Sequence, residues 1–185
     1  LNKPAGCVSA TEDRNDRTVM EYVPSDRKGI FPVGRLDKDT EGLLLITDDG
    51  MLAHELLSPR KHVDKVYFAK VSGQFGENEI ARFKEGLDIG NGEKSKQARL
   101  QILKADVQES EVLITIMEGK FHQVKRMFEA EGGEVIYLKR LSMGPLALDE
   151  ALATGEYRAL TEDEIRALKE RMLTSQNCVS NDENL

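Results

Sequence analysis

The chain has 185 residues, of which 39% are hydrophobic and 32% charged, a composition typical of a globular protein without a membrane span. Its formal net charge of −7 argues weakly against a nucleic-acid partner, because phosphate binding needs Lys and Arg. Charges can be unevenly distributed, however, and an acidic chain can carry a locally basic face. The two cysteines, Cys7 and Cys178, fit no metal or redox spacing, so we expect a reducing, cytoplasmic setting.

The pattern of apolar residues predicts an α+β fold. Helical spacing predicts helices over residues 18–23, 51–57, 77–84, 122–131 and 161–172. Short apolar or β-branched runs predict extended segments over residues 1–10, 30–33, 43–46, 60–71, 98–103, 111–117 and 134–141. Hairpins interspersed with helices favour a mixed, mostly antiparallel sheet flanked by helices, in one domain over residues 1–173. We expect the polar tail over residues 174–185 to be disordered.

A charged loop precedes one of the predicted strands. The sequence GRLDKDTEG, from Gly34 to Gly42, places two glycines around a dense set of charges, directly before the apolar run LLLI. Glycine permits a tight loop, and a loop held by a buried strand is a good position for a reactive group. Asp37, two residues after Arg35, is the candidate for that group. The alternative is a solvated turn, and the spacing alone favours neither interpretation.

The remaining chemistry is limited to carboxylates, bases and one aromatic side chain. None of the three histidines has the spacing of a helix-borne metal site, and no phosphate-binding glycine loop or nucleophile elbow is present. Tyr67 lies in the predicted strand over residues 60–71, whose alternation places it on one face with Lys65. Lys125 lies in the first turns of a predicted helix, where the partial positive charge favours an anion. Considered alone, Tyr67 is best interpreted as a core residue and Lys125 as part of a solvated helix face. If both converge on Asp37, they would hold an ionised nucleophile beside an aromatic ring.

Four motifs together resemble the pseudouridine synthases of the RsuA class (RsuA, RluB, RluE and RluF). In the family's order they are LNKPxG from Leu1, GRLDxxTxGLL from Gly34, KxY from Lys65 and EGKxHQVKRMF from Glu118. The resemblance extends to about Leu168. It implies an isomerase that converts uridine in RNA to pseudouridine without a metal or cofactor, built on a catalytic domain with a central active-site cleft.

The resemblance also implies roles for four residues. Asp37 matches the family's essential aspartate, which attacks the uridine at ring carbon 6 or at the anomeric carbon of the sugar. Tyr67 matches the tyrosine that stacks on the target uracil and helps to remove the carbon 5 proton, and Lys125 matches the basic partner of the aspartate. Arg35 matches the arginine that enters the RNA stack when the target base is flipped out, a step required because a stacked base cannot reach a side chain.

The expected partner is ribosomal RNA, bound by a monomer. The candidate RNA contacts are basic or polar residues near the motifs: Lys3, Lys61, Lys65, Lys94, Lys96, Lys120, His122, Gln123 and Arg126. The sequence HQVKRMF resembles that of the RsuA branch, whose members modify one uridine of 16S rRNA. This resemblance favours a partly assembled small subunit as the substrate. The alternatives are a 23S rRNA synthase of the same class and a non-catalytic rRNA-binding or assembly factor. Full-length relatives usually carry an S-four-like RNA-binding module before the catalytic domain, and we expect that module to be absent here, through loss or truncation.

Overall fold

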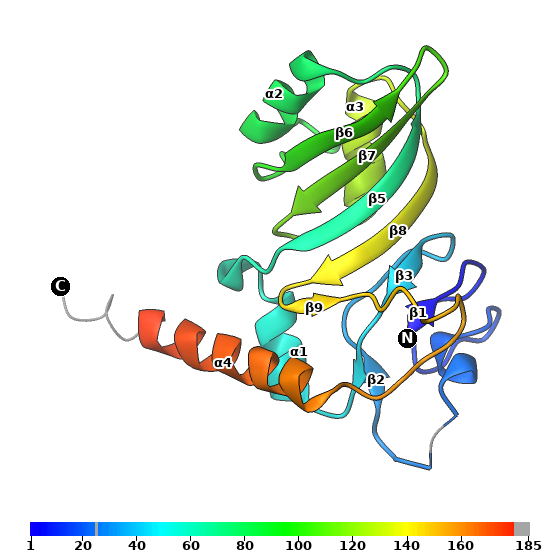
Figure 1. Cartoon of the computed structure of the whole chain (residues 1–185), viewed down its shortest axis with the longest axis vertical. Coiled ribbons are helices and arrows are strands. Elements are labelled where there is room, and N and C mark those ends of the chain that lie inside the picture. Colours follow the sequence, from blue (N-terminus) through cyan, green and yellow to red (C-terminus); the bar gives the residue numbers. More distant parts are fainter. Residues whose placement is uncertain (25, 180–185) are drawn as a thin grey trace.

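The computed structural model describes residues 1–24 and 26–179, and its main layer is a sheet (Figure 1). Within these ranges, seven strands form this sheet: β1 (Asn2–Lys3), β3 (Glu41–Leu43), β5 (Lys65–Ser72), β6 (Arg99–Ala105), β7 (Glu109–Ile116), β8 (Val135–Met143) and β9 (Leu146–Ala147). Their order is β1-β3-β8-β5-β7-β6, and β9 pairs with β8. Strands β3 and β8 are parallel, whereas the other described neighbours are antiparallel. The predicted α+β class with a mixed, mostly antiparallel sheet is confirmed.

Helices cover one face of the long strands and one end of the sheet. They are α1 (Gly50–Leu57), α2 (Glu77–Glu85), α3 (Gln123–Ala130) and α4 (Glu162–Val179), with 3-10 turns η1 (Val19–Tyr22) and η2 (Pro59–Lys61). The short strands β2 (Phe31–Pro32) and β4 (Ile46–Thr47) pair separately. In Figure 1, α3 lies behind the long strands, α2 lies beside the edge strand β6, and α4 extends outward from the lower end.

The larger core lies between the sheet and helices α2 and α3. Side chains of β5 alternate between buried and half-buried, as the two-residue period of a strand predicts, and Tyr67 is on the buried face. The ring of Phe128 in α3 packs against Phe75 and against Phe83 of α2, with centroids 5.3 and 5.1 Å apart. Burial of this apolar surface, at about 25 cal/mol per Å², fixes α3 against the sheet and so fixes the side chains that α3 presents.

The leucine run after the charged loop is divided between two strands, so the prediction of a single buried strand is wrong. Strand β3 begins before the run and β4 begins at its last residue. Leu44 packs in the larger core, whereas Leu43 and Leu45 pack in a second core that α1 and α4 share. The backbone therefore passes from one core to the other here. Leu44 N–H donates to the Leu1 carbonyl at 2.9 Å, whereas the Leu45 carbonyl accepts from Val33 N–H at 2.8 Å, so the run does not pair with a single neighbouring strand.

Several other boundaries differ from the predicted ones. Helix α1 begins after Asp49, whose carboxylate accepts the Leu52 N–H at 2.9 Å, as expected of an N-cap. Strand β5 starts at Lys65 and not at residue 60, because the preceding residues form η2 and His62 adopts a left-handed conformation with φ 46°. The short strand β9 was not predicted.

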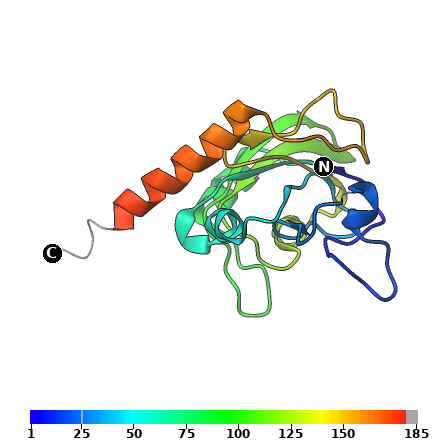
Figure 2. The ribbon, with the colours of Figure 1, turned by 90° about the horizontal axis from the view of Figure 1, so that it is seen from below.

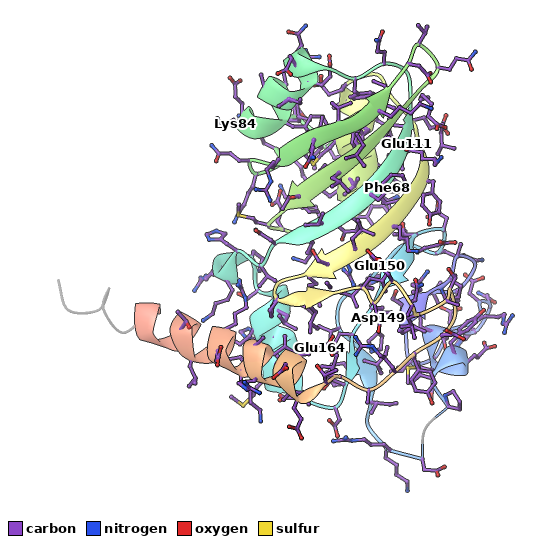
Figure 3. The ribbon with its side chains drawn as sticks, in the orientation of Figure 1. Phe68, Lys84, Glu111, Asp149, Glu150 and Glu164 are labelled. Atoms are coloured by element: carbon purple, nitrogen blue, oxygen red, sulfur yellow. The ribbon has the colours of Figure 1, made fainter. Side chains whose placement is uncertain are left out.

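The C-terminal helix α4 is longer than expected. It begins with a capping box in which Thr161 and Glu164 exchange hydrogen bonds, and Arg158 joins Glu164 to Asp149 beside this start (Figure 3). It continues to Val179, so disorder from residue 174 onward is wrong for residues 174–179, which contain no Gly or Pro to end a helix. Residues 180–185 lie outside the described ranges. Among the described helices, none is both long and apolar enough to cross a membrane.

Candidate active site

The charged loop is fixed at its end by a close approach of two backbones. Gly42 has φ 103° and faces Arg140 across the parallel pair of β3 and β8. A Cβ atom on Gly42 would collide with the Arg140 carbonyl oxygen, so only glycine fits this position. The buried Arg140 side chain donates from Nε to the Leu43 carbonyl at 2.8 Å. These contacts set where the loop leaves the sheet, and therefore where Asp37 lies.

A buried lysine holds the same loop from below. Lys3 is fully buried, and its ammonium group donates to the carbonyls of Pro4 (3.0 Å), Asp37 (3.1 Å), Lys38 (3.4 Å) and Thr40 (2.8 Å). The expectation that Lys3 contacts RNA is therefore wrong, because all of its donors point into the protein. It orders the backbone on both sides of Asp37 instead.

The segment before α3 presents a second set of polar groups to the loop. His122 is the N-cap residue of α3 and has a left-handed backbone with φ 48°. The side chain of Gln123 accepts the Lys120 N–H at 2.9 Å and donates to the Glu118 carboxylate at 2.7 Å. Gln123 is 4% exposed and ties the turn to the start of the helix, and its contact with RNA stays a prediction. This arrangement orients Lys125, which lies in the first turn of α3.

Lys125 is shared between two carboxylates of the charged loop. Its Nζ atom lies 3.4 Å from Asp37 Oδ2 and donates to both oxygens of Asp39, at 2.7 and 2.9 Å. Burial lowers the pKa of Lys125. The hydrogen bond to Asp39 and the negative charge of Asp37 together raise this pKa by more than burial lowers it, so the net shift is upward. Although burial raises the pKa of Asp39, the hydrogen bond from Lys125 outweighs it and lowers that pKa overall. The sequence interpretation missed Asp39, although its position two residues after Asp37 in a charged loop was the available signal.

One pocket joins the four candidate catalytic residues. Asp37, Tyr67, Lys125 and Arg35 all line it, together with the start of α3. Tyr67 is 7% exposed, and the Asp37 side chain is 27% exposed, so the carboxylate is reachable while the ring is largely enclosed. His122 also approaches, with Nε2 3.7 Å from Asp37 Oδ1. The convergence of a carboxylate, a cation and an aromatic ring that the sequence suggested is thus present.

The candidate RNA contacts are distributed unevenly. Lys120 and His122 line the pocket, and the Lys120 ammonium donates to the carbonyl of Lys94, an exposed residue. Lys96 is exposed and donates to the Pro59 carbonyl at 3.2 Å. Lys61 does not line the pocket and pairs with Glu55 at 3.2 Å.

Two further candidates serve the fold. Arg126 donates to three backbone carbonyls and to the Glu93 carboxylate at 2.6 Å, so its guanidinium fastens the loop before β6 to α3. That loop and the loop over residues 11–17 project on the same side of the molecule (Figure 2). Lys65 is 7% exposed and donates to the Val63 carbonyl at 3.2 Å. The predicted contact of Lys65 with RNA is therefore wrong, because its side chain is buried and donates to a local carbonyl. The contact of the half-buried Arg126 with RNA stays a prediction.

Replacing Lys65 by Met is expected to raise the free energy of unfolding by about 1–2 kcal/mol at pH 7, because the variant buries no ammonium group. Burial, followed by the charge of Arg140, lowers the pKa of Lys65 from 10.5 to about 8. Between these two values the unfolded chain keeps a proton that the folded protein has released, so wild-type stability rises with pH across this window. Urea denaturation at pH 7 and near pH 10 measures the effect: the advantage of the variant should shrink at the higher pH. An equal advantage at both values would contradict this explanation.

Within residues 1–24 and 26–179, no three His, Cys, Asp or Glu side chains are grouped closely enough to hold a metal ion. The polar groups that line the pocket can act as acid, base, nucleophile and hydrogen-bonding groups. A reachable carboxylate beside an ammonium group is suited to nucleophilic attack.

Comparison with known proteins identifies the class. The model of the RNA pseudouridylate synthase family matches residues 1–130. An uncharacterized RNA pseudouridine synthase of Bacillus subtilis, YtzG, is 50% identical over 172 residues, which cover 92% of this chain and 72% of that protein. The ribosomal small subunit pseudouridine synthase A of Haemophilus influenzae is 42% identical over 170 residues, which cover 91% of this chain and 72% of that protein.

Solved structures agree with this assignment. A crystal structure of a pseudouridylate synthase matches with a TM-score of 0.82 and 41% identity, over 91% of this chain and 71% of that one. A chain of the archaeal box H/ACA sRNP Nop10-Cbf5 complex shares the fold, with a TM-score of 0.61 and 20% identity, over 84% of this chain and 50% of that one. The protein belongs to the RNA pseudouridylate synthase family. It is an isomerase that acts on uridine in RNA.

Proposed function

We propose that this protein converts one uridine of 16S ribosomal RNA to pseudouridine, with the Asp37 carboxylate as nucleophile. The observation that carries the proposal is the 3.4 Å ion pair between Lys125 Nζ and Asp37 Oδ2, in a pocket that Tyr67 also lines. The choice of RNA is supported by the relative from Haemophilus influenzae, which is named for the small ribosomal subunit. Ribosomal RNA as the substrate also implies action in the cytoplasm.

The proposed reaction begins with attack by Asp37 on carbon 6 of the uracil or on the anomeric carbon of the sugar. In either route the bond between N1 and the sugar breaks, the base rotates, and carbon 5 bonds to the anomeric carbon. The bond between Asp37 and the substrate also breaks, by displacement from the anomeric carbon when carbon 5 attacks it or by elimination from carbon 6 in the other route, which regenerates the carboxylate. Carbon 5 then loses its proton and N1 gains one. Substrate and product contain the same atoms, so the balance requires no oxidant, reductant or group donor. The Lys125 ammonium group, 3.4 Å from Asp37 Oδ2, places a positive charge beside the attacking carboxylate.

Tyr67 and Arg35 complete the proposed site. The enclosed Tyr67 ring offers an aromatic face on which the flipped uracil stacks, and its hydroxyl is a candidate to accept the carbon 5 proton. Arg35 is exposed at the pocket and forms no hydrogen bond or ion pair with the described residues. Its planar guanidinium can fill the gap that the flipped base leaves in the RNA stack.

The proposed RNA surface surrounds this pocket. Lys120 and His122 line it, and exposed Lys94 and Lys96 lie on the loop before β6, so these four remain candidate phosphate contacts. We propose that the protein acts as a monomer on a partly assembled small subunit. The proposed catalytic domain begins at residue 1. We place its end at Val179, the last residue of α4, and not at residue 173.

The proposal is tested by release of tritium from carbon 5 of labelled uridine in rRNA. The substrates are free 16S rRNA, a partly assembled small-subunit particle and 23S rRNA as the control. We expect release from the 16S substrates, with the particle preferred. Release from 23S rRNA alone would overturn the choice of RNA and leave the chemistry intact. Binding without release from any substrate, also in a longer protein with an upstream RNA-binding module, would favour a non-catalytic rRNA-binding factor.

A further inference from the structure

Two stacked rings at the edge of the pocket have no role in the proposed reaction. The ring centroids of Phe121 and His122 are 3.8 Å apart, with an angle of 19° between their planes. Phe121 is 72% exposed, although it is a large apolar side chain. Scattered exposed apolar residues are common, but this ring directly follows the turn that orients the active-site helix.

The backbone holds this pair in place. His122 adopts a left-handed backbone conformation that non-glycine residues rarely take, and its imidazole lines the pocket. The Arg126 guanidinium donates to the Phe121 carbonyl at 3.2 Å, and the Arg126 N–H donates to the His122 carbonyl at 3.0 Å. The backbone that carries the two rings is therefore tied to α3.

The pair connects the reactive carboxylate with the outside. His122 Nε2 lies 3.7 Å from Asp37 Oδ1. Phe121, which stacks on the His122 imidazole, is open to solvent. The spacing of the two rings is close to the roughly 3.4 Å that separates successive bases in a nucleic-acid strand. A further planar ring placed on the open face of Phe121 would continue the same stack.

We infer that Phe121 and His122 form a stacking platform for a nucleobase that neighbours the target uridine in the RNA. The inference rests on the proposed function, because it takes the RNA substrate as the ligand. A base on Phe121 fixes the strand at the edge of the pocket, and the adjoining nucleotide is then guided toward Asp37. Lys120, which lines the pocket one residue earlier, supplies a cation for the connecting phosphate.

The absence of tryptophan from the sequence provides a direct probe. Phe121→Trp keeps a stacking ring and introduces a single fluorophore, and Val107→Trp is the matched control at another strongly exposed apolar residue, 82% exposed. On titration with a 16S rRNA transcript, we expect the fluorescence of Phe121→Trp to be quenched and that of Val107→Trp to change little. Equal quenching of both variants, or of neither, would overturn the inference.

Affinity gives the second measurement. One stacked base contributes roughly 1–3 kcal/mol, so Phe121→Ala should weaken binding of the same transcript by roughly 10- to 100-fold. Phe121→Leu keeps an apolar side chain without a ring and should fail to restore affinity, whereas Phe121→Trp should restore it. Wild-type affinity in Phe121→Leu would overturn the inference. Both readouts report binding, so they are separate from turnover: quenching without tritium release by wild type would contradict the proposed function alone, and release without quenching would contradict the platform alone.

Discussion

Replacing Asp37 by Asn is expected to reduce the single-turnover rate of pseudouridine formation by at least about 10⁴-fold, measured by chromatography of nucleosides from digested RNA. The amide is neutral and cannot form the bond to the uridine that the carboxylate forms, so the whole nucleophilic contribution is lost. The side chain of Asn has nearly the same size and shape, so the pocket formed with Tyr67 and Lys125 should persist.

Folding and RNA binding should be nearly unchanged in this variant. The Asp37 side chain is 27% exposed and its ion pair with Lys125 spans 3.4 Å, while Asp39 retains Lys125 through two shorter hydrogen bonds. An exposed ion pair contributes about 0–1 kcal/mol, so the change in the free energy of unfolding should stay within that range. A variant that loses turnover because it unfolds, shown by a lowered denaturation midpoint, would contradict the assigned role.

Replacing Lys3 by Met is expected to lower the free energy of unfolding by about 3 kcal/mol and to slow turnover as well. The substitution leaves buried carbonyls of the loop without a donor, and each such group costs roughly 1–3 kcal/mol. Burial lowers the pKa of Lys3, so its charge is costly to bury, and part of this cost is recovered in the variant. The loss of donors to Asp37 and Thr40 should also let the loop move.

Urea denaturation measures the stability of this variant, and the matched control is Lys38→Met. Lys38 lies in the same loop, but its side chain is 53% exposed and pairs with Asp16 at the surface. We expect the control to change the free energy of unfolding by less than about 0.5 kcal/mol. If Lys3→Met were as stable and active as the control, the buried ammonium group would not order the loop.

The sequence predicted the elements whose signals are local. The carboxylate of Asp49 and the turn at Gly86 mark helix ends, and alternation along β5 correctly placed Tyr67 on the same face as Lys65, which the structure buries. These features depend on residues within a few positions of each other. The leucine run was harder, because whether Leu44 and Leu45 pack in one core or in two depends on the rest of the fold.

The candidate site was predicted to the extent that the motifs carry it. Asp37, Tyr67 and Lys125 come from distant segments, and their meeting in one pocket rested on the family resemblance. The sequence could not distinguish a surface lysine from a buried one: nothing in the residues next to Lys3 or Lys65 indicates that tertiary packing encloses their side chains. The sequence shows that a loop is rich in charged residues, but it does not show which of these charged side chains are paired with other groups inside the protein.

The central claim is that, of the two carboxylates that share Lys125, Asp37 is the reactive one. The most direct measurement is tritium release from carbon 5 of uridine in 16S rRNA by Asp37→Asn and Asp39→Asn, assayed side by side with wild type. We predict that Asp37→Asn releases none above background, while Asp39→Asn keeps a rate within about tenfold of wild type, because its carboxylate only holds Lys125. Release by Asp37→Asn at the wild-type rate, or its loss only in Asp39→Asn, would contradict this assignment.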